Sequence, residues 1–250
     1  MLAFSSLLGS VEGQNRYKIW YDKPASYWEE ALPIGNGRIA AMVFGDPQLE
    51  QIQLNEETVS AGSPYQNYNE EAKAALPEMR RLIFEGKYEE AQNMAATKIL
   101  SQVGNEMPYQ TVGRLNIRYQ DHKKVSNYYR DLDISNAMTV TRYKVDGVEF
   151  TEETFASFTD QLVIRHIKSS KPGAINCELF FNTPMRDPKR SIYGKKGLRL
   201  EGITHGSRYF PGKVHYCADL DVKNKGGEVT MANDTLLSVQ GASELTLYIS

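Results

Sequence analysis

Short runs in which apolar and polar residues alternate fill most of the chain from Arg114 onward. Leu115, Ile117 and Tyr119, for example, are separated by polar residues. A period of two places successive side chains on opposite faces, as in a half-buried β-strand. We therefore predict strands over residues 17–21, 38–44, 114–119, 137–145, 148–155, 162–167, 175–181, 198–203, 214–222, 228–232, 236–239 and 245–249. Many short strands without alternating helices indicate an all-β fold, a large antiparallel β-sandwich.

A helical period interrupts this pattern between residues 69 and 102. Apolar residues recur at positions 72, 75, 76, 79, 82 and 83, and again at 88, 91, 94, 95 and 99. Positions three and four apart share one face of a helix. Asn69 is a candidate cap and Gly86 a candidate helix end, while Pro77 either kinks the first helix or starts a fresh one. We predict an inserted helical hairpin near residues 70–102, packed against a sheet.

A Gly35-Asn36-Gly37 sequence separates two apolar runs near the start of the chain. Because Asn and Gly tolerate positive φ, Asn36 and Gly37 are predicted to occupy both central positions of a tight turn, with residues 38–44 leaving it as a buried strand. A polar block, Asn55-Glu56-Glu57-Thr58, follows this strand.

Length and charge limit the number of domains and the kinds of partner that we expect for this chain. A chain of 250 residues with 41% hydrophobic residues can bury one large core, so we predict a single domain over residues 17–250. Residues 1–16 include a short apolar patch that is typical of a signal remnant or a disordered tail. The net charge of −2 does not favour nucleic acid as a partner. No apolar run approaches the roughly 20 residues that span a bilayer.

The cysteines and histidines predict neither a disulfide nor a cofactor. Alternation places Cys177 on the apolar face of its strand and Cys217 on the opposite face, which favours two free thiols over a bridge. Neither thiol has metal-ligand spacing to another Cys or His, and the four histidines are scattered singly. We therefore expect no metal and no cofactor.

An ordered set of motifs extends over nearly the whole chain. It comprises Trp28, the segment from Glu30 to Gly45, Gln53-Leu-Asn-Glu-Glu-Thr58, the segments 74–83 and 86–91, Tyr109-Gln110 with Gly113, Tyr129-Arg-Asp-Leu-Asp133, Gly147-Val148, Phe155-Ala-Ser157 and Gly241-Ala-Ser-Glu-Leu245. This set resembles the amino-terminal domain of glycoside hydrolase family 95, the α-L-fucosidase family. The resemblance implies a β-supersandwich that precedes a catalytic α/α barrel.

The same resemblance implies where catalysis takes place. In that family the general acid and the water-activating residues lie in the barrel, which would follow Ser250, so we expect no catalytic residue in this chain. The parent protein is then an inverting, exo-acting enzyme whose partners are its own barrel and a glycan. An α-L-galactosidase is the second possibility, because its sugar differs from fucose by one hydroxyl group. Such an enzyme is expected in the periplasm or outside the cell.

Polar residues near the first turn are the candidate site. Asn36, Arg38, Asn55, Glu56 and Thr58 are predicted to shape the rim of the barrel's pocket or the interface with the barrel, since ligands often bind at domain junctions. The alternative is that the glycines only permit the turn and that Asn55 and Thr58 only satisfy local backbone groups. The acids available for a two-carboxylate mechanism are Glu29, Glu30, Glu56, Glu57, Asp219 and Asp221, which are otherwise solvated surface acids.

Aromatic residues support a different class of function. Ten of them are candidates for a platform on which sugars stack: Trp20, Tyr21, Tyr27, Trp28, Tyr65, Tyr68, Tyr128, Tyr129, Tyr209 and Phe210. A sandwich that displayed them in a row would be an independent carbohydrate-binding module. The competing interpretation is that they pack in the core and in a domain interface.

Overall fold

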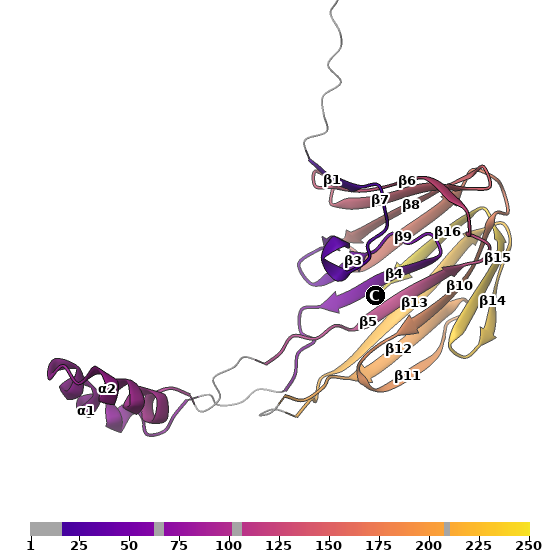
Figure 1. The fold of residues 1–250 in the computed structure, drawn as a ribbon. Coiled ribbons are helices and arrows are strands. Elements are labelled where there is room, and N and C mark those ends of the chain that lie inside the picture. Colours follow the sequence, from indigo (N-terminus) through magenta and orange to yellow (C-terminus); the bar gives the residue numbers. More distant parts are fainter. Residues whose placement is uncertain (1–16, 63–67, 102–106, 208–210) are drawn as a thin grey trace, which may run out of the picture.

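Two antiparallel sheets pack face to face in the computed structural model, which describes residues 17–62, 68–101, 107–207 and 211–250 (Figure 1). The predicted tail over residues 1–16 lies outside the described residues. The first sheet has nine strands in the order β1 (Lys18–Tyr21), β6 (Val125–Asp133), β7 (Met138–Val145), β8 (Val148–Ser157), β9 (Leu162–Ser169), β16 (Glu244–Ile249), β13 (His215–Lys225), β12 (Gly197–Ile203) and β11 (Arg186–Tyr193).

The second sheet has seven strands, and all of its pairings are also antiparallel. Their order is β14 (Glu228–Asn233), β15 (Leu236–Ala242), β10 (Ile175–Asn182), β5 (Gly113–Tyr119), β4 (Leu49–Glu56), β3 (Ile39–Val43) and β2 (Leu32–Gly35). The predicted all-β sandwich is confirmed. A short 3₁₀ helix, η1 (Trp28–Glu30), precedes β2.

Four strands, β2, β4, β6 and β11, were not predicted. β4 carries Gln51 and Gln53 on its outer face, so its sequence is too polar to stand out as an apolar run. β6 contains a bulge between Ser126 and Tyr129, which breaks its alternation. β11 is an edge strand with no buried residue.

Alternation along the strands produces the core. In β10, Ile175, Cys177, Leu179 and Phe181 all point inward and are buried, whereas the residues between them face outward. The inward rows of both sheets join in one buried cluster. Cys177 is buried, Cys217 is exposed and both thiols are free, as predicted.

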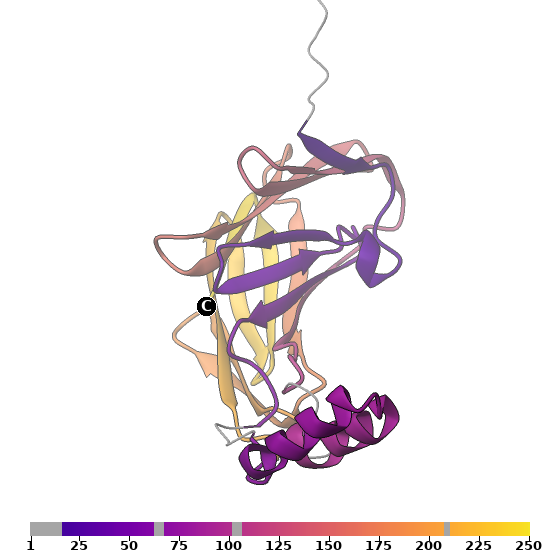
Figure 2. The same ribbon diagram turned by 90° about the vertical axis from the view of Figure 1, so that its left-hand side faces the viewer.

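The helical hairpin consists of α1 (Ala72–Phe84), α2 (Tyr88–Met94) and a π-helical turn, η2 (Ala95–Ile99). Its position near residues 70–102 is confirmed, and α1 continues through Pro77 without a break. The prediction that it packs against a sheet is wrong, because the helices pack on each other and stand clear of the sandwich (Figures 1 and 2). None of the helices in the described residues is long and apolar enough to cross a membrane.

The turn between β2 and β3 differs from the expected one. Gly37 has a φ of +95°, but Asn36 is not among the described residues with positive φ. Asn36, Gly37 and Arg38 instead form a three-residue connection, because β2 ends at Gly35 and β3 begins at Ile39. The Asn36 side chain, described below, stabilises this conformation in place of a second positive φ.

Candidate functional site

The candidate rim residues lie together at one end of β3 and β4. The pairing of these strands places Ile39 opposite Glu56 and the next residue, Ala40, opposite Asn55. Arg38 Nε lies 3.4 Å from Glu56 Oε1, and Glu56 Oε2 accepts hydrogen bonds from the backbone N–H and the hydroxyl group of Thr58. The fold therefore brings these residues together, although they are up to 22 positions apart in the sequence. Each polar contact among them is local, which is also expected if these residues only stabilise the turn and its neighbouring backbone.

Asn36 connects this end of the molecule to the other sheet. Its Oδ1 accepts hydrogen bonds from the backbone N–H groups of Arg38 (3.1 Å) and Ile39 (2.9 Å). Its Nδ2 donates to the carbonyl oxygen of Ser157 at 2.8 Å, where β8 ends. The Asn36 amide thus fixes the β2–β3 turn against the β8–β9 turn.

A small cavity of ≈ 110 Å³ opens beside Arg38, Asn55 and Glu56. Gln161 of the β8–β9 turn and Cys217 of the nine-stranded sheet are among the residues that line its other side. Pockets that enclose a small-molecule ligand usually measure about 300–1,000 Å³. The cavity is therefore too small to enclose a substrate by itself, and the roles of Asn36, Arg38, Asn55, Glu56 and Thr58 at a rim or interface stay a prediction.

Three of the candidate acids are held by other groups of this domain. Asp219 receives two hydrogen bonds of 2.7 Å from Arg199, one to each carboxylate oxygen. Glu30 accepts a 2.8 Å hydrogen bond from the backbone N–H of Ser26, which lowers the pKa of this carboxyl group. Glu56 is paired with Arg38 as described. Such contacts are typical of surface acids that stabilise local structure.

A buried ionic cluster between the sheets was not anticipated from the sequence. Arg165 of β9 donates from Nη2 to Glu50 of β4 (3.0 Å) and to Glu152 of β8, and from Nη1 to Thr154 (2.8 Å). Both carboxylates and the guanidinium group are essentially inaccessible to solvent. Glu50 lies on the same face of β4 as Ile52 and Leu54, so its inward position could have been deduced once β4 was recognised as a strand.

Two tyrosines complete this cluster. Tyr119 of β5 and Tyr143 of β7 donate to the same oxygen of Glu152, at 2.6 Å and 2.7 Å. The second carboxylate, Glu50, accepts from the backbone N–H groups of Phe44 and Gly45. The cluster thus joins both sheets through hydrogen bonds, and it satisfies most of its polar atoms without water.

Burial sets the proton affinity of this cluster. It raises the pKa of Glu50 to about 7, although Arg165 opposes the shift, and Glu152 adds to it. Two carboxylates that face one arginine resemble an acid–base pair in composition. They lie in a sealed core, however, where neither a glycan nor a nucleophilic water can reach them. We therefore assign the cluster a structural role.

The described residues include no group of three or more His, Cys, Asp or Glu side chains that could hold a metal ion. His122 is buried and stacks on Tyr119 with ring centroids 4.6 Å apart. Its Nδ1 lies 3.0 Å from the carbonyl oxygen of Pro47, so this nitrogen carries the proton. Burial lowers the pKa of His122, which favours the neutral ring.

The two tryptophans do not belong to the core. Trp20 is 60% exposed and Trp28 is 50% exposed, so packing in the core is excluded for both, whereas packing in a domain interface stays a prediction. Trp20 stacks on Tyr129 at the β1 edge of the nine-stranded sheet, and Trp28 lies on η1. The apolar residues around Trp20 and Trp28 in the sequence suggested burial, but the edge position of β1 and the surface position of η1 leave both indoles accessible.

Comparison with known proteins places this geometry in a family. The family model described as "Glycosyl hydrolase family 65, N-terminal domain" matches residues 19–250. A solved structure, the putative kojibiose phosphorylase from human microbiome, aligns with a TM-score of 0.47 and 10% identity over 94% of this chain and 32% of that chain.

Curated relatives carry fucosidase names. The Alpha-L-fucosidase 2 of Arabidopsis thaliana is 37% identical over 93% of this chain and 30% of its own length. The Probable alpha-fucosidase A of Aspergillus niger is 26% identical over 61% of this chain and 20% of its own length. The chain thus spans about a third or less of these relatives. The expected similarity to the front end of a fucosidase-like glycoside hydrolase is confirmed, and the chain belongs to the glycosyl hydrolase family 65 N-terminal domain family.

Proposed function

We propose that this chain is the non-catalytic N-terminal domain of a fucosidase-like, inverting, exo-acting glycoside hydrolase, and that it braces a catalytic α/α barrel of the same polypeptide. The main support is the helical hairpin, which exposes large apolar side chains. Phe84 is 88% exposed, Tyr88 is 69% exposed and Leu100 is 60% exposed. Exposed apolar groups gathered on one projecting element are typical of a docking surface.

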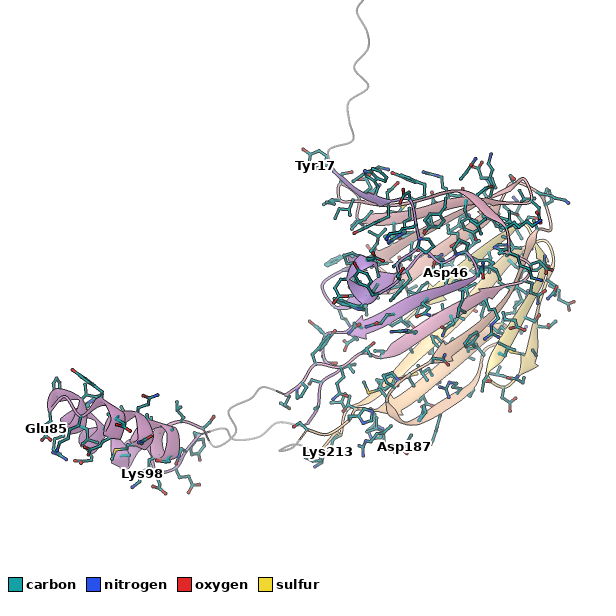
Figure 3. The ribbon with its side chains drawn as sticks, in the orientation of Figure 1. Tyr17, Asp46, Glu85, Lys98, Asp187 and Lys213 are labelled. Atoms are coloured by element: carbon teal, nitrogen blue, oxygen red, sulfur yellow. The ribbon has the colours of Figure 1, made fainter. Side chains whose placement is uncertain are left out.

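The hairpin also lacks a core of its own. Only Ala75, Leu82 and Ala91 are buried within α1 and α2. Helices of this length are marginal in water unless tertiary packing covers their apolar face. Glu85 in Figure 3 marks the end of the hairpin farthest from the sandwich. The matched region is 30% of the length of the Arabidopsis relative and 20% of that of the Aspergillus niger relative, so a barrel in the same polypeptide is the partner that we propose to cover the hairpin.

Two features support a non-catalytic role. The buried carboxylates of Glu50 and Glu152 are inaccessible, and the surface acids Glu56 and Asp219 are paired with arginines. In the complete enzyme, Arg38 and its neighbours would then contribute to the rim of a pocket whose acid and base belong to the barrel. A test is the assay of this chain alone on nitrophenyl α-L-fucoside and α-L-galactoside. Release of nitrophenol above the uncatalysed rate would contradict the proposal.

The bracing role is tested by comparing this chain with the longer polypeptide that carries the barrel. Hydrogen–deuterium exchange of the α1 and α2 amides should be fast in the chain alone and slowed at least tenfold in the longer polypeptide. The Phe84→Ser and Tyr88→Ser variants should lower the thermal midpoint of the longer polypeptide but not of the chain alone. Trp20→Ser, which changes an exposed aromatic residue away from the hairpin, is the control. Equal exchange in both proteins would overturn the bracing role.

The same proposal extends to substrate and location. The longer polypeptide is expected to prefer α-L-fucosides over α-L-galactosides, and the ratio of its kcat/KM values on the two nitrophenyl substrates decides between them. Arg38→Ala should raise KM more than it lowers kcat if this side chain lies at the pocket rim. We also propose export to the periplasm or the medium, which cell fractionation tests.

A further inference from the structure

The outer face of the seven-stranded sheet carries an open groove that the proposed function does not use. Two hollows of ≈ 510 Å³ and ≈ 630 Å³ both include Gln51 and Arg114 in their lining, so they lie next to each other on this face. The groove crosses β10, β5, β4 and the end of β3, four neighbouring strands that together span roughly 15 Å. We call it the amide groove after the residues that line its floor, Gln51, Gln53, Asn116 and Asn182.

Strand register places these amides side by side. Gln51 lies opposite Asn116, while Gln53 and Asn182 lie on either side of Arg114. Asn116 is only 3% exposed although it is on the outer face. Its Nδ2 donates to the carbonyl oxygens of Arg114 and Phe180, at 3.2 Å and 3.3 Å, which fixes the direction of this amide. A carboxamide both donates and accepts, as a sugar hydroxyl does.

Arg114 is the cation shared by both hollows. Its Nη1 donates to Gln51 Oε1 at 2.7 Å, and its guanidinium carbon lies 5.6 Å from the centre of the Phe44 ring. Four residues further along β5, Arg118 is paired with Glu178 at 2.9 Å, but Arg114 is in none of the salt bridges found among the described residues. The remaining N–H groups of a guanidinium held in this way are suited to charge-assisted hydrogen bonds with hydroxyl oxygens.

Aromatic side chains border the second hollow. Tyr27 is 57% exposed and Trp28 is 50% exposed, and both line this hollow together with Asp46, which is labelled in Figure 3. Exposed tyrosine and tryptophan offer an apolar ring next to a polar group, which matches the apolar C–H face and the polar rim of a pyranose ring. The groove therefore provides stacking at one end and hydrogen bonds along its floor.

These observations select the class of ligand. The lining of the first hollow mixes four amides with Leu49, Phe180 and Pro184, which suits a sugar ring with an apolar face and polar hydroxyl groups better than a wholly apolar protein surface. Nucleic acid requires several uncompensated cations, and Lys23 and Arg118 on either side of Arg114 both lie near acids, Glu30 and Glu178. We propose that the amide groove binds a neutral oligosaccharide of a few units. The choice of a fucosylated chain as its ligand rests on the proposed function.

Isothermal titration calorimetry on this chain, with a fucosylated xyloglucan nonasaccharide as the probe, tests the proposal. We expect a dissociation constant below about 1 mM. Arg114→Ala and Trp28→Ala should each weaken binding at least tenfold. The matched controls are Arg142→Ala, an exposed arginine on the other sheet, and Trp20→Ala, an indole of similar exposure at the β1 edge. Both controls should bind within about twofold of the unchanged protein, and thermal midpoints verify that each variant is folded.

Absence of binding at millimolar oligosaccharide overturns the proposal. So does an affinity that Arg114→Ala leaves unchanged, or one that the controls reduce equally. These results are independent of the test of the proposed function, which depends on hydrolysis and on exchange in the hairpin. A domain that braces a barrel but ignores the oligosaccharide would refute only the amide groove.

Discussion

Arg165 of β9 reaches across the interior to Glu50 of β4, with Nη2 3.0 Å from Oε2. The two residues belong to different sheets, and both side chains have no measurable exposure. A buried pair of this kind is weak evidence for net stabilisation, because removing both charges from water has a large cost. Removing only one partner is different, since the other charge then stays buried without compensation.

Arg165→Leu should therefore destabilise the domain by about 3–5 kcal/mol, because it leaves Glu50 and Glu152 facing each other in a dry core. Urea unfolding followed by tyrosine and tryptophan fluorescence measures this change. Arg142→Leu, on the exposed side of the neighbouring β7–β8 pair, is the matched control and should change stability by about 0.5 kcal/mol or less. A loss below about 1 kcal/mol for Arg165→Leu would show that the cluster tolerates the deletion.

The pH dependence of stability should report on Glu50. Burial raises the pKa of this carboxyl group from 4.5 to about 7, so the folded state binds a proton that the unfolded state releases between these values. The contribution of Glu50 is therefore fully present below about pH 4.5 and is lost as the pH rises through about 7. Glu50→Gln should flatten the decline of unfolding free energy in this window.

The comparison requires urea titrations of both proteins at several pH values, with Glu57→Gln as an exposed control. The difference in slope between the unchanged protein and Glu50→Gln isolates the Glu50 carboxyl group from all other groups that titrate. Identical slopes would mean that Glu50 has the same proton affinity in the folded and unfolded states.

Gly45 should resist substitution more than Gly147, although both glycines have a positive φ. Its φ is +76°, and a Cβ atom there would lie 2.7 Å from Tyr128 Oη and 2.9 Å from Arg130 Cδ. Gly45→Ala is expected to cost about 2–4 kcal/mol, because backbone strain and overpacking add. Gly147→Ala is the control, since Gly147 has a φ of +81° but no atom within 4 Å of the added carbon. Thermal or urea unfolding should show a clearly smaller loss for Gly147→Ala, and equal losses would remove the packing argument.

The thiols should differ in reactivity. Cys217 is exposed and Cys177 is buried, and burial raises the pKa of both thiols. An excess of a disulfide reagent at pH 8 should modify one equivalent in the native protein and two after unfolding in urea. Cys217→Ser should abolish modification of the native protein and leave one equivalent, that of Cys177, after unfolding. Modification of both thiols without denaturant would show that β10 opens readily.

The sequence pattern was sufficient for elements whose faces differ clearly in polarity. β10 and β13 alternate strictly, so their strands, their buried faces and the opposite environments of Cys177 and Cys217 followed from parity alone. The pattern did not predict the charged side chains that occupy inward-facing positions of a strand. Glu50 and Arg165 occupy inward positions, and no single strand reveals the partner that makes such burial tolerable.

The candidate rim was only partly predictable. Nearness of Arg38 and Glu56 follows from the hairpin that joins β3 to β4. The hydrogen bond from Asn36 to Ser157 does not, because it depends on how the two sheets are placed against each other. The helical hairpin was predicted from the spacing of its apolar residues. Its separation from the sandwich could not be predicted, because an amphipathic helix pattern does not identify the surface that covers it.

Two of the four edge strands, β2 and β11, each contain a proline, Pro33 and Pro188. A free sheet edge can recruit a strand from another molecule, and proline removes a backbone donor that such an addition needs. Lys189 and Arg190 next to Pro188 add charge at the same margin. These two margins are therefore protected against the addition of a strand from another molecule.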